Sequence, residues 1–232
     1  SPTTGQMTVI KTQDVTYTKR ETKVAELVGT ECPTFVYPNV DDQDYALFSL
    51  DPVSLKAAAA GMGGGLTQPL LRVMVWNTLS QMVRDAKLAP REFFDIALPS
   101  VEKEKDDDVL SIILGGYGPI IGNYFTYLTR EERMEIAPRL ETIAWNRTLS
   151  ATKGSSQQLS FFDFYTSIVQ ATDGTAKLRA FLDNKGLPKG FALDQDRRWS
   201  VIKSLASNGH ADATKLIDGE EKKDPSTAGK RF

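Results

Sequence analysis

The side chains best suited to catalysis are scarce in this chain. His210 is the one histidine and Cys32 the one cysteine among 232 residues. A zinc-peptidase helix of the H-E-x-x-H type needs two histidines one turn apart, and three-histidine sites and zinc fingers also need more ligands than are present. A Ser-His-Asp or Cys-His site would have to use His210. Because His210 lies between Gly209 and Ala211, where one predicted helix ends and the next begins, a connecting or capping role is the better interpretation.

Two other patterns suggest ligand sites but are better explained as helix ends. Gly61-Met62-Gly63-Gly64-Gly65 is rich in glycine, yet no Gly-Lys-Ser/Thr follows, so we interpret it as a flexible joint rather than a phosphate-binding loop. Asp106-Asp107-Asp108 lacks the spaced pattern of a calcium loop. Carboxylates before a helix complement its dipole instead. The sequence therefore indicates no catalytic, cofactor-binding or metal-binding residue.

Aromatic runs and runs of mixed charge have simple structural interpretations. Phe161-Phe162 and Phe164-Tyr165 could line a peptide groove, although aromatic residues at helical spacing usually belong to a core. The charged runs Lys103-Glu104-Lys105 and Glu220-Glu221-Lys222-Lys223 are predicted to be solvated helix faces.

Composition indicates an ordinary globular protein, with 41% hydrophobic and 25% charged residues. A net charge of −2 argues against nucleic acid as a partner, and no apolar run approaches the roughly 20 residues of a membrane span. The lone Cys32, together with the absence of a signal segment at the start, predicts a cytoplasmic location. The opening residues 1–6 lack an initiator Met, which suggests added tag residues or a piece of a longer protein.

The chain divides into two regions by its apolar period. Within residues 1–50, β-branched and aromatic residues predict short strands at 8–12, 15–18 and 45–50. From Asp51 onward the period changes from two to about 3.6. Helix starts such as Asp51-Pro52 and the capping box of Thr129 with Glu132 recur at short intervals. We therefore predict a mainly α fold, an irregular helical-repeat α-superhelix of the HEAT or armadillo type over residues 51–232, preceded by a few strands.

The stretch Leu193-Asp194-Gln195-Asp196-Arg197-Arg198-Trp199 predicts the start of an amphipathic helix. Asp194 can cap it by accepting a bond from a free backbone N–H one turn in, and Asp196 lies where the helix dipole favours a carboxylate. Gly209 stands where a C-terminal glycine belongs. The predicted buried face holds Trp199, Ile202 and Leu205.

Taken together, several stretches resemble the carboxyl-terminal part of bacterial aminopeptidase N, a zinc-dependent exopeptidase, in the variant typical of actinobacteria. The resemblance runs from about residue 24 to the end. It is carried by Val28-Gly29, Pro38-Asn39-Val40-Asp41-Asp42, Tyr45-Ala46, Leu50-Asp51-Pro52-Val53-Ser54-Leu55, Val75-Trp76, Met82-Val83-Arg84-Asp85, the Leu193 to Trp199 stretch, and Lys222-Lys223-Asp224-Pro225-Ser226-Thr227-Ala228-Gly229.

This resemblance implies that the chain is the non-catalytic end of a longer enzyme. The family's catalytic domain carries H-E-x-x-H, a further zinc-binding Glu and a Gly-x-Met-Glu-Asn loop, and none of these is in this sequence. A β-sandwich and then a bowl of helices follow that domain in the family. Residues 1–50 would be the last strands of the sandwich, and residues 51–232 the helical domain that covers the active site and limits which peptides enter.

The expected partners are therefore the catalytic domain of the same parent chain and peptide substrates. Zinc is expected in the missing domain, and the parent would remove N-terminal residues from peptides. The chain alone is not expected to be an enzyme.

Two alternatives remain open from the sequence. One is an independent helical-repeat scaffold that binds a protein or peptide on a concave face. The other is an enzyme that uses His210 with nearby carboxylates, although no nucleophile or metal partner stands at a motif spacing.

Overall fold

The computed structural model describes residues 6–115, 119–226 and 229. Residues 1–5 of the opening segment, which suggests added tag residues or a piece of a longer protein, lie outside this part, as do residues 227–228 of the C-terminal match. The described residues are mainly helical, as predicted. They form the 3₁₀ helices η1 (Ala25–Leu27) and η2 (Val40–Asp42), and α1 (Pro52–Gly61), α2 (Pro69–Arg84), α3 (Pro90–Lys103), α4 (Asp107–Leu114), α5 (Ile120–Phe125), α6 (Arg130–Ser150), α7 (Ser156–Ile168), α8 (Thr172–Phe181), α9 (Gln195–Ser207) and α10 (Ala213–Glu221).

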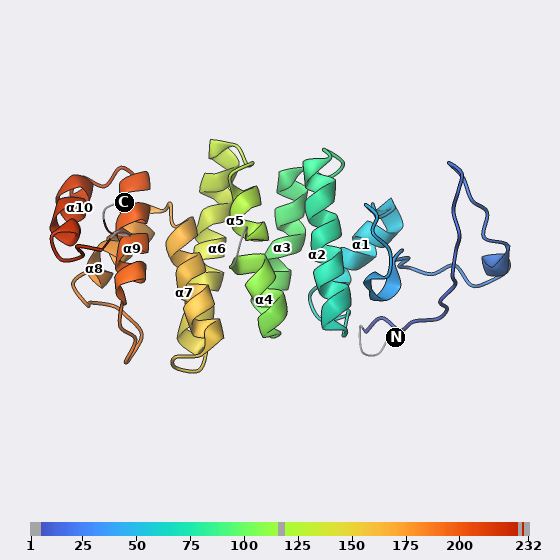
Figure 1. The fold of residues 1–232 in the computed structure, drawn as a ribbon, viewed down its shortest axis with the longest axis horizontal. Coiled ribbons are helices and arrows are strands. Elements are labelled where there is room, and N and C mark those ends of the chain that lie inside the picture. Colours follow the sequence, from blue (N-terminus) through green and yellow to red (C-terminus); the bar gives the residue numbers. More distant parts are fainter. Residues whose placement is uncertain (1–5, 116–118, 227–228, 230–232) are drawn as a thin grey trace.

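The helices stand side by side in an elongated array that follows the order of the chain (Figure 1). Contacts run from α2 to α4, from α4 to α7 and from α7 to α9, so these helices form one row. A second row is formed by α1, α3 and α6, which also contact one another in succession. The most extensive contact, between α6 and α7, joins the two rows, and α10 closes the C-terminal end by packing on α9.

Several helix starts lie where the sequence predicts them because a local side-chain cap fixes each of these. Asp51 accepts bonds from the backbone N–H groups of Val53 and Ser54. Thr129 and Glu132 form the reciprocal capping box of α6. Asp106, the first residue of the acidic triplet, caps α4 in the same way as Asp51 caps α1.

An apolar core runs along the array between the two rows. At one end Trp76, Phe93 and Phe94 pack edge to face. At the other end all four aromatic residues of α7 that were candidates for a peptide groove are buried, so that hypothesis is wrong. The reason is position, since α7 is covered by α4, α6 and α9 and has no free apolar face. These four residues are Phe161, Phe162, Phe164 and Tyr165.

The strands predicted before residue 51 are not confirmed within residues 6–50, where the structure describes only the two 3₁₀ helices. Segments 8–12, 15–18 and 45–50 have no regular structure, and Val9, Ile10 and Leu47 are exposed. A strand exists only when a neighbouring strand takes up its backbone hydrogen bonds. No backbone bond joins these three segments to one another within this region.

The N-terminal region nevertheless attaches to the first helices at a few points. The backbone N–H of Met7 donates to the carbonyl of Gly65 over 2.9 Å. The Val36 N–H donates to the hydroxyl of Ser54 over 2.9 Å. The Tyr37 hydroxyl lies 2.9 Å from that of Thr78 on α2, and its ring packs against the core.

A buried carboxylate joins α6 to the start of α8. Glu141 is 7% exposed, and its Oε1 accepts bonds from the backbone N–H groups of Gln170 at 2.9 Å and Ala171 at 3.1 Å. Gly174, in the first turn of α8, lets this carboxylate approach, because a Cβ there would lie only 2.4 Å from Glu141 Oε2. Position 174 therefore requires glycine because the Glu141 carboxylate lies too close for any side chain there.

Gly174→Ala is expected to lower the free energy of unfolding by about 1–3 kcal/mol, because overpacking outweighs the better helix propensity of alanine. The matched control is Gly219→Ala inside α10, where nothing lies within 4 Å of an added Cβ. That change should raise the free energy of unfolding by about 0.5–1 kcal/mol. Urea unfolding of both variants measures the difference, and equal stabilisation of the two would contradict the packing argument.

Candidate functional site

The stretch from Leu193 to Trp199 leads into α9, around which the polar contacts of the C-terminal end are organised. Asp194 caps the helix as predicted, accepting a bond from the backbone N–H of Arg197 over 2.8 Å. Gly209 follows the helix with a φ of +68°, the left-handed conformation that favours glycine. The predicted apolar face is buried through Trp199, Ile202 and Leu205.

Two side chains of this stretch join α9 to segments on either side. Arg197 donates from Nε and Nη2 to the carboxylate of Asp163 on α7, over 2.8 and 2.9 Å. Burial raises the pKa of the Asp163 carboxyl, and the Arg197 bond opposes that shift in part. On the other side, the indole Nε1–H of Trp199 donates to Asp224 Oδ2 over 2.7 Å, which fixes the segment after α10.

A largely buried polar contact at this end joins Arg198 of α9 to Glu220 of α10. Arg198 Nε and Nη2 donate to the two oxygens of Glu220 over 2.6 and 2.7 Å, and Gln195 Nε2 adds a bond of 3.0 Å. Glu220 is only 3% exposed. The hydrogen bond from Arg198 is the main cause that lowers the pKa of Glu220 from 4.5 to about 2, against the opposing effect of burial.

The burial of Glu220 corrects the prediction that residues 220–223 form a solvated face. Glu220 lies three and four residues after Ile217 and Leu216, so it shares the helix face that packs on α9. The run of charges suggests that all four residues are solvated, although the helical spacing of Glu220 from Leu216 and Ile217 indicates that it is buried.

The second charged run, residues 103–105, is also predicted to be solvated, and it also contains a buried glutamate. Glu104 is 6% exposed and receives Nε and Nη2 of Arg72 over 2.8 and 3.0 Å, which joins α2 to the end of α3. Its Oε1 also accepts the backbone N–H groups of Lys105 and Asp106. Arg147 of α6 donates to the Glu104 carbonyl over 2.6 Å. Glu104 follows Val101 and Ala97 at helical spacing, so this glutamate also continues a buried face.

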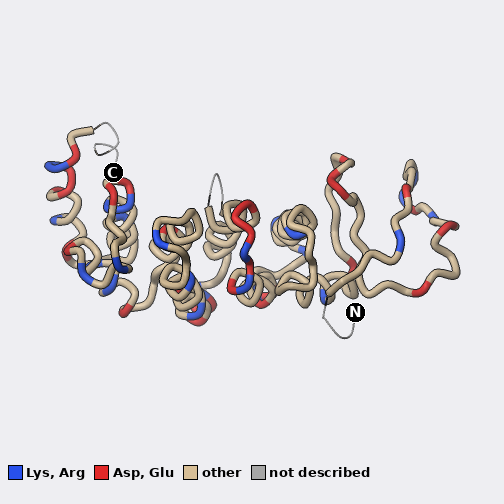
Figure 2. The backbone as a smooth tube through the Cα atoms, turned by 90° about the horizontal axis from the view of Figure 1, so that it is seen from below, with Lys and Arg blue, Asp and Glu red and all other residues tan. Residues whose placement is uncertain are grey.

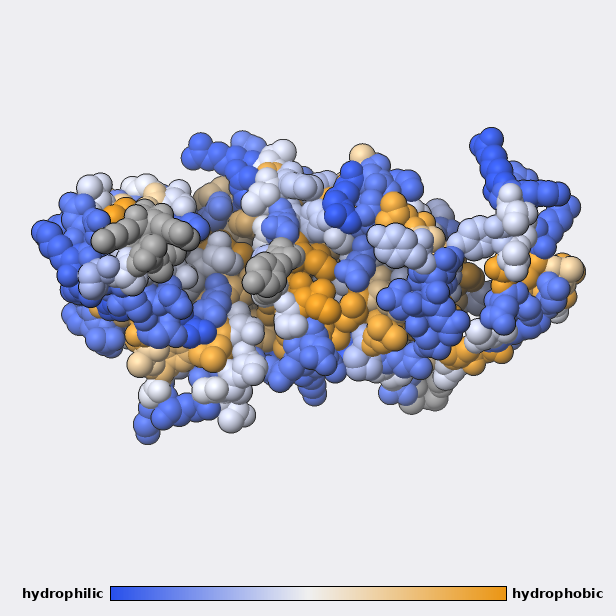
Figure 3. All heavy atoms as spheres, in the orientation of Figure 1, coloured by the Kyte–Doolittle hydropathy of each residue, from blue (hydrophilic) through white to orange (hydrophobic). Residues whose placement is uncertain are grey.

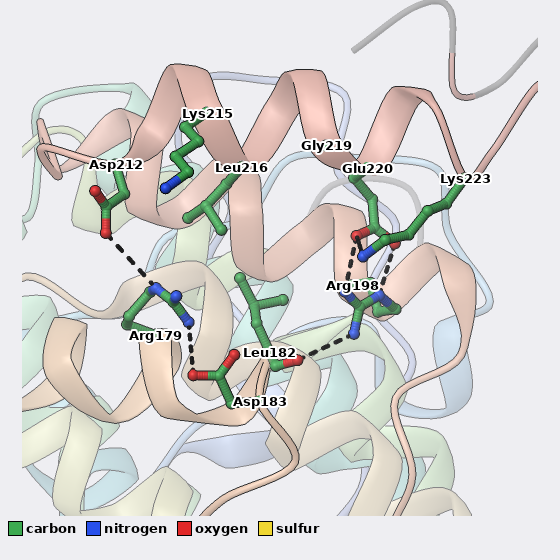
Figure 4. A pocket seen from close by; sticks show the side chains of 10 residues that line it. All are labelled: Arg179, Leu182, Asp183, Arg198, Asp212, Lys215, Leu216, Gly219, Glu220 and Lys223. Carbon is green, nitrogen blue, oxygen red and sulfur yellow. Dashed lines mark hydrogen bonds and ion pairs between the residues drawn. The ribbon is translucent and has the colours of Figure 1, made fainter.

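A cleft of about 180 Å³ lies where α8, α9 and α10 meet (Figure 4). Four cationic and three carboxylate side chains line it, with Leu182 and Leu216 as its apolar part. On the face of the molecule drawn in Figure 3, the C-terminal end is mostly hydrophilic, and apolar surface gathers at the middle of the array and on the N-terminal region. The charged lining residues are Arg179, Asp183, Arg198, Asp212, Lys215, Glu220 and Lys223.

His210 has a local capping role in this region. Its Nδ1 accepts the backbone N–H of Asp212 over 3.2 Å, at the turn that leads into α10. In the part of the chain that the structure describes, no three His, Cys, Asp or Glu side chains gather as metal ligands would. Cys32 lies exposed in the N-terminal region. An enzyme built on His210 therefore has no metal cluster among the described residues to support it.

Two further properties of the surface bear on partners. Acidic and basic residues are intermixed along the array rather than separated by sign (Figure 2). None of the helices in the described residues combines the length and the apolar character that a membrane span requires.

The sequence profile of the ERAP1-like C-terminal domain family matches residues 35–232. The chain belongs to this family. Aminopeptidase N of Streptomyces lividans is 29% identical over 210 residues, which make up 90% of this chain and 24% of that protein. The chain therefore spans about a quarter of the length of this curated relative, and the resemblance to the C-terminal part of aminopeptidase N is confirmed.

In this ERAP1-like domain, Glu220→Gln should lower the free energy of unfolding at pH 7 by about 2–4 kcal/mol, because Arg198 loses its charged partner in a largely buried contact. The change leaves side-chain volume nearly unaltered. The control is the exposed neighbour, Glu221→Gln, whose effect should stay within about 0.5 kcal/mol. Chemical unfolding of each variant measures the difference.

The contact between Arg198 and Glu220 also predicts how stability changes at acidic pH. A carboxyl whose pKa is lowered on folding contributes stability above its unfolded pKa, and this contribution is lost as the pH falls through the folded pKa. For Glu220 that window runs from 4.5 down to about 2. The difference in unfolding free energy between wild type and Glu220→Gln should shrink through this window, and a constant difference would contradict the assignment.

Proposed function

We propose that this chain is the non-catalytic C-terminal helical domain of a zinc aminopeptidase, which covers the active site and gates the access of peptides. The observation that carries the proposal is the family match over residues 35–232, together with a relative named aminopeptidase N of which the chain spans 24%. The other three quarters of such a protein leave room for a catalytic domain. The parent enzyme would remove N-terminal residues from peptides.

The proposal places the chemistry outside this chain. Its residues do not fit a zinc site of the peptidase type, since the sequence holds one histidine and no metal-ligand group gathers among the described residues. Zinc in the upstream domain would supply an activated water for peptide hydrolysis. What this chain contributes is a wall of fixed shape beside that site, within a cytoplasmic enzyme whose ligands are peptides.

The two regions of the chain have different roles in this proposal. Residues 51–232 form the helical domain, a helical-repeat α-superhelix, for which the two rows of successively contacting helices are the support. Residues 1–50 contain the last strands of a preceding β-sandwich. The exposed Val9, Ile10 and Leu47 support this, because these apolar side chains would gain cover from the upstream sheet.

A first experiment tests where the chemistry lies. The purified chain should bind no stoichiometric zinc by elemental analysis and should not hydrolyse an aminoacyl anilide. Zinc bound at one ion per chain together with hydrolysis would overturn the proposal. The reading frame upstream separates it from an independent scaffold: a frame that extends through an H-E-x-x-H motif supports the peptidase domain, and a frame that starts near residue 1 supports the scaffold.

A second experiment tests gating in the full-length parent. Truncation after residue 50 removes the helical wall, so the ratio of kcat/KM for a ten-residue peptide to that for an aminoacyl anilide should change several-fold. Zinc content and anilide hydrolysis of the truncated protein are the controls that its catalytic domain is intact. An unchanged ratio in a zinc-loaded truncated enzyme would contradict gating.

A third experiment tests the strand assignment by hydrogen exchange. In the chain alone, the amides of residues 8–18 lack ladder partners and should exchange within seconds. In the full-length parent they should be protected by about 100-fold or more, because an upstream sheet takes up their hydrogen bonds. Amides of α7, buried in the core, serve as the internal control and should be protected in both proteins. Equal, fast exchange of residues 8–18 in both proteins would rule out the sandwich.

A further inference from the structure

Two cationic groups face each other across the cleft between α8, α9 and α10. Arg179 projects from α8 and Lys215 from α10, and their charged ends point toward one another (Figure 4). Like charges that face each other repel, and the repulsion is stronger beside apolar groups such as Leu182 and Leu216 than in open water. The carboxylates of Asp183 and Asp212 offset this repulsion in part, and an anion between the two cations would offset more of it.

Arg179 retains unused hydrogen-bonding capacity. Its Nη1 lies 3.1 Å from Asp183 Oδ2 and its Nε 3.9 Å from Asp212 Oδ2, which are ion-pair distances. Neither contact has hydrogen-bond geometry, and Nη1 is buried without a hydrogen-bond partner among the described residues. Because Nη1 is enclosed beside Asp183, the N–H groups that a ligand could reach are those on the exposed part of this side chain, which is 32% exposed as a whole.

Arg198, which lines the same cleft, differs from Arg179 because hydrogen bonds within the protein occupy its guanidinium. Its guanidinium donates to both oxygens of Glu220 and to the carbonyl of Leu182. Arg198 is therefore occupied in joining α9 to α10. Of the two arginines that line the cleft, Arg179 is the one with donors to offer.

We propose that this cleft binds a small oxyanion, a carboxylate or phosphate group held between Arg179 and Lys215. The planar guanidinium supplies paired donors that match two oxygens of such a group, and the ammonium supplies a point charge. The lining has four cations against three carboxylates, so the sign of the charge favours an anion. A volume of about 180 Å³ restricts the ligand to a small molecule or one side chain. The inference does not depend on the peptidase assignment.

The test is a titration of the chain with two probes, inorganic phosphate and N-acetylglutamate, followed by amide chemical shifts at constant ionic strength. Saturable shifts are expected in α8 and α10. Lys215 is exposed, so Lys215→Gln should keep the fold while weakening binding about tenfold or more. Lys222→Gln removes the same charge from the end of α10 but does not line the cleft, and should change affinity less than about twofold.

Each outcome decides the proposal. Tighter binding of phosphate identifies a free phosphate-type ligand, and tighter binding of N-acetylglutamate identifies a carboxylate. The proposal is overturned if neither probe gives saturable shifts in α8 and α10, or if Lys222→Gln weakens binding as much as Lys215→Gln. Arg179→Gln provides a second variant, expected to lose binding while the bond between Trp199 and Asp224 keeps the indole fluorescence of the wild type.

Discussion

Buried glutamates at the joints between helices are the constraint on which the rest of this array depends. Glu104 joins α2 to the end of α3, Glu141 joins α6 to α8, and Glu220 joins α9 to α10. A carboxylate taken out of water is tolerated only when it is hydrogen-bonded, so each joint favours the geometry that supplies those bonds. The apolar core holds the helices together, and the glutamates specify how successive helices are placed.

The parts of the fold that could be predicted are those decided within a few residues. Asp51, Thr129 and Asp194 cap helices because each needs only a backbone N–H two or three residues away. The apolar face of α9 likewise follows from spacing alone. These caps place the starts of α1, α6 and α9, and the helical period after Asp51 gives the mainly α fold class.

The parts that could not be predicted depend on partners distant in the sequence. The burial of Glu104 and Glu220 requires Arg72 and Arg198, which are 32 and 22 residues away, and charged runs at helix ends are usually solvated. The cleft forms where three helices meet, so no pattern within one segment of the sequence predicts it. The segments before residue 51 have the composition of strands but no pairing partner within residues 6–50.

Helices contact mainly their neighbours along the array, so the fold is an elongated row of helices and not a globule packed around one centre. The stiffness of such a row is determined separately at each contact between neighbouring helices. The contact between α6 and α7 is broad, whereas α10 has Glu220 as its one fully buried residue and packs on α9 through the partly buried Leu216 and Ile217. Bending and local opening should therefore concentrate at the C-terminal end of the array, because α10 has fewer fully buried side chains than the other α-helices of the described residues.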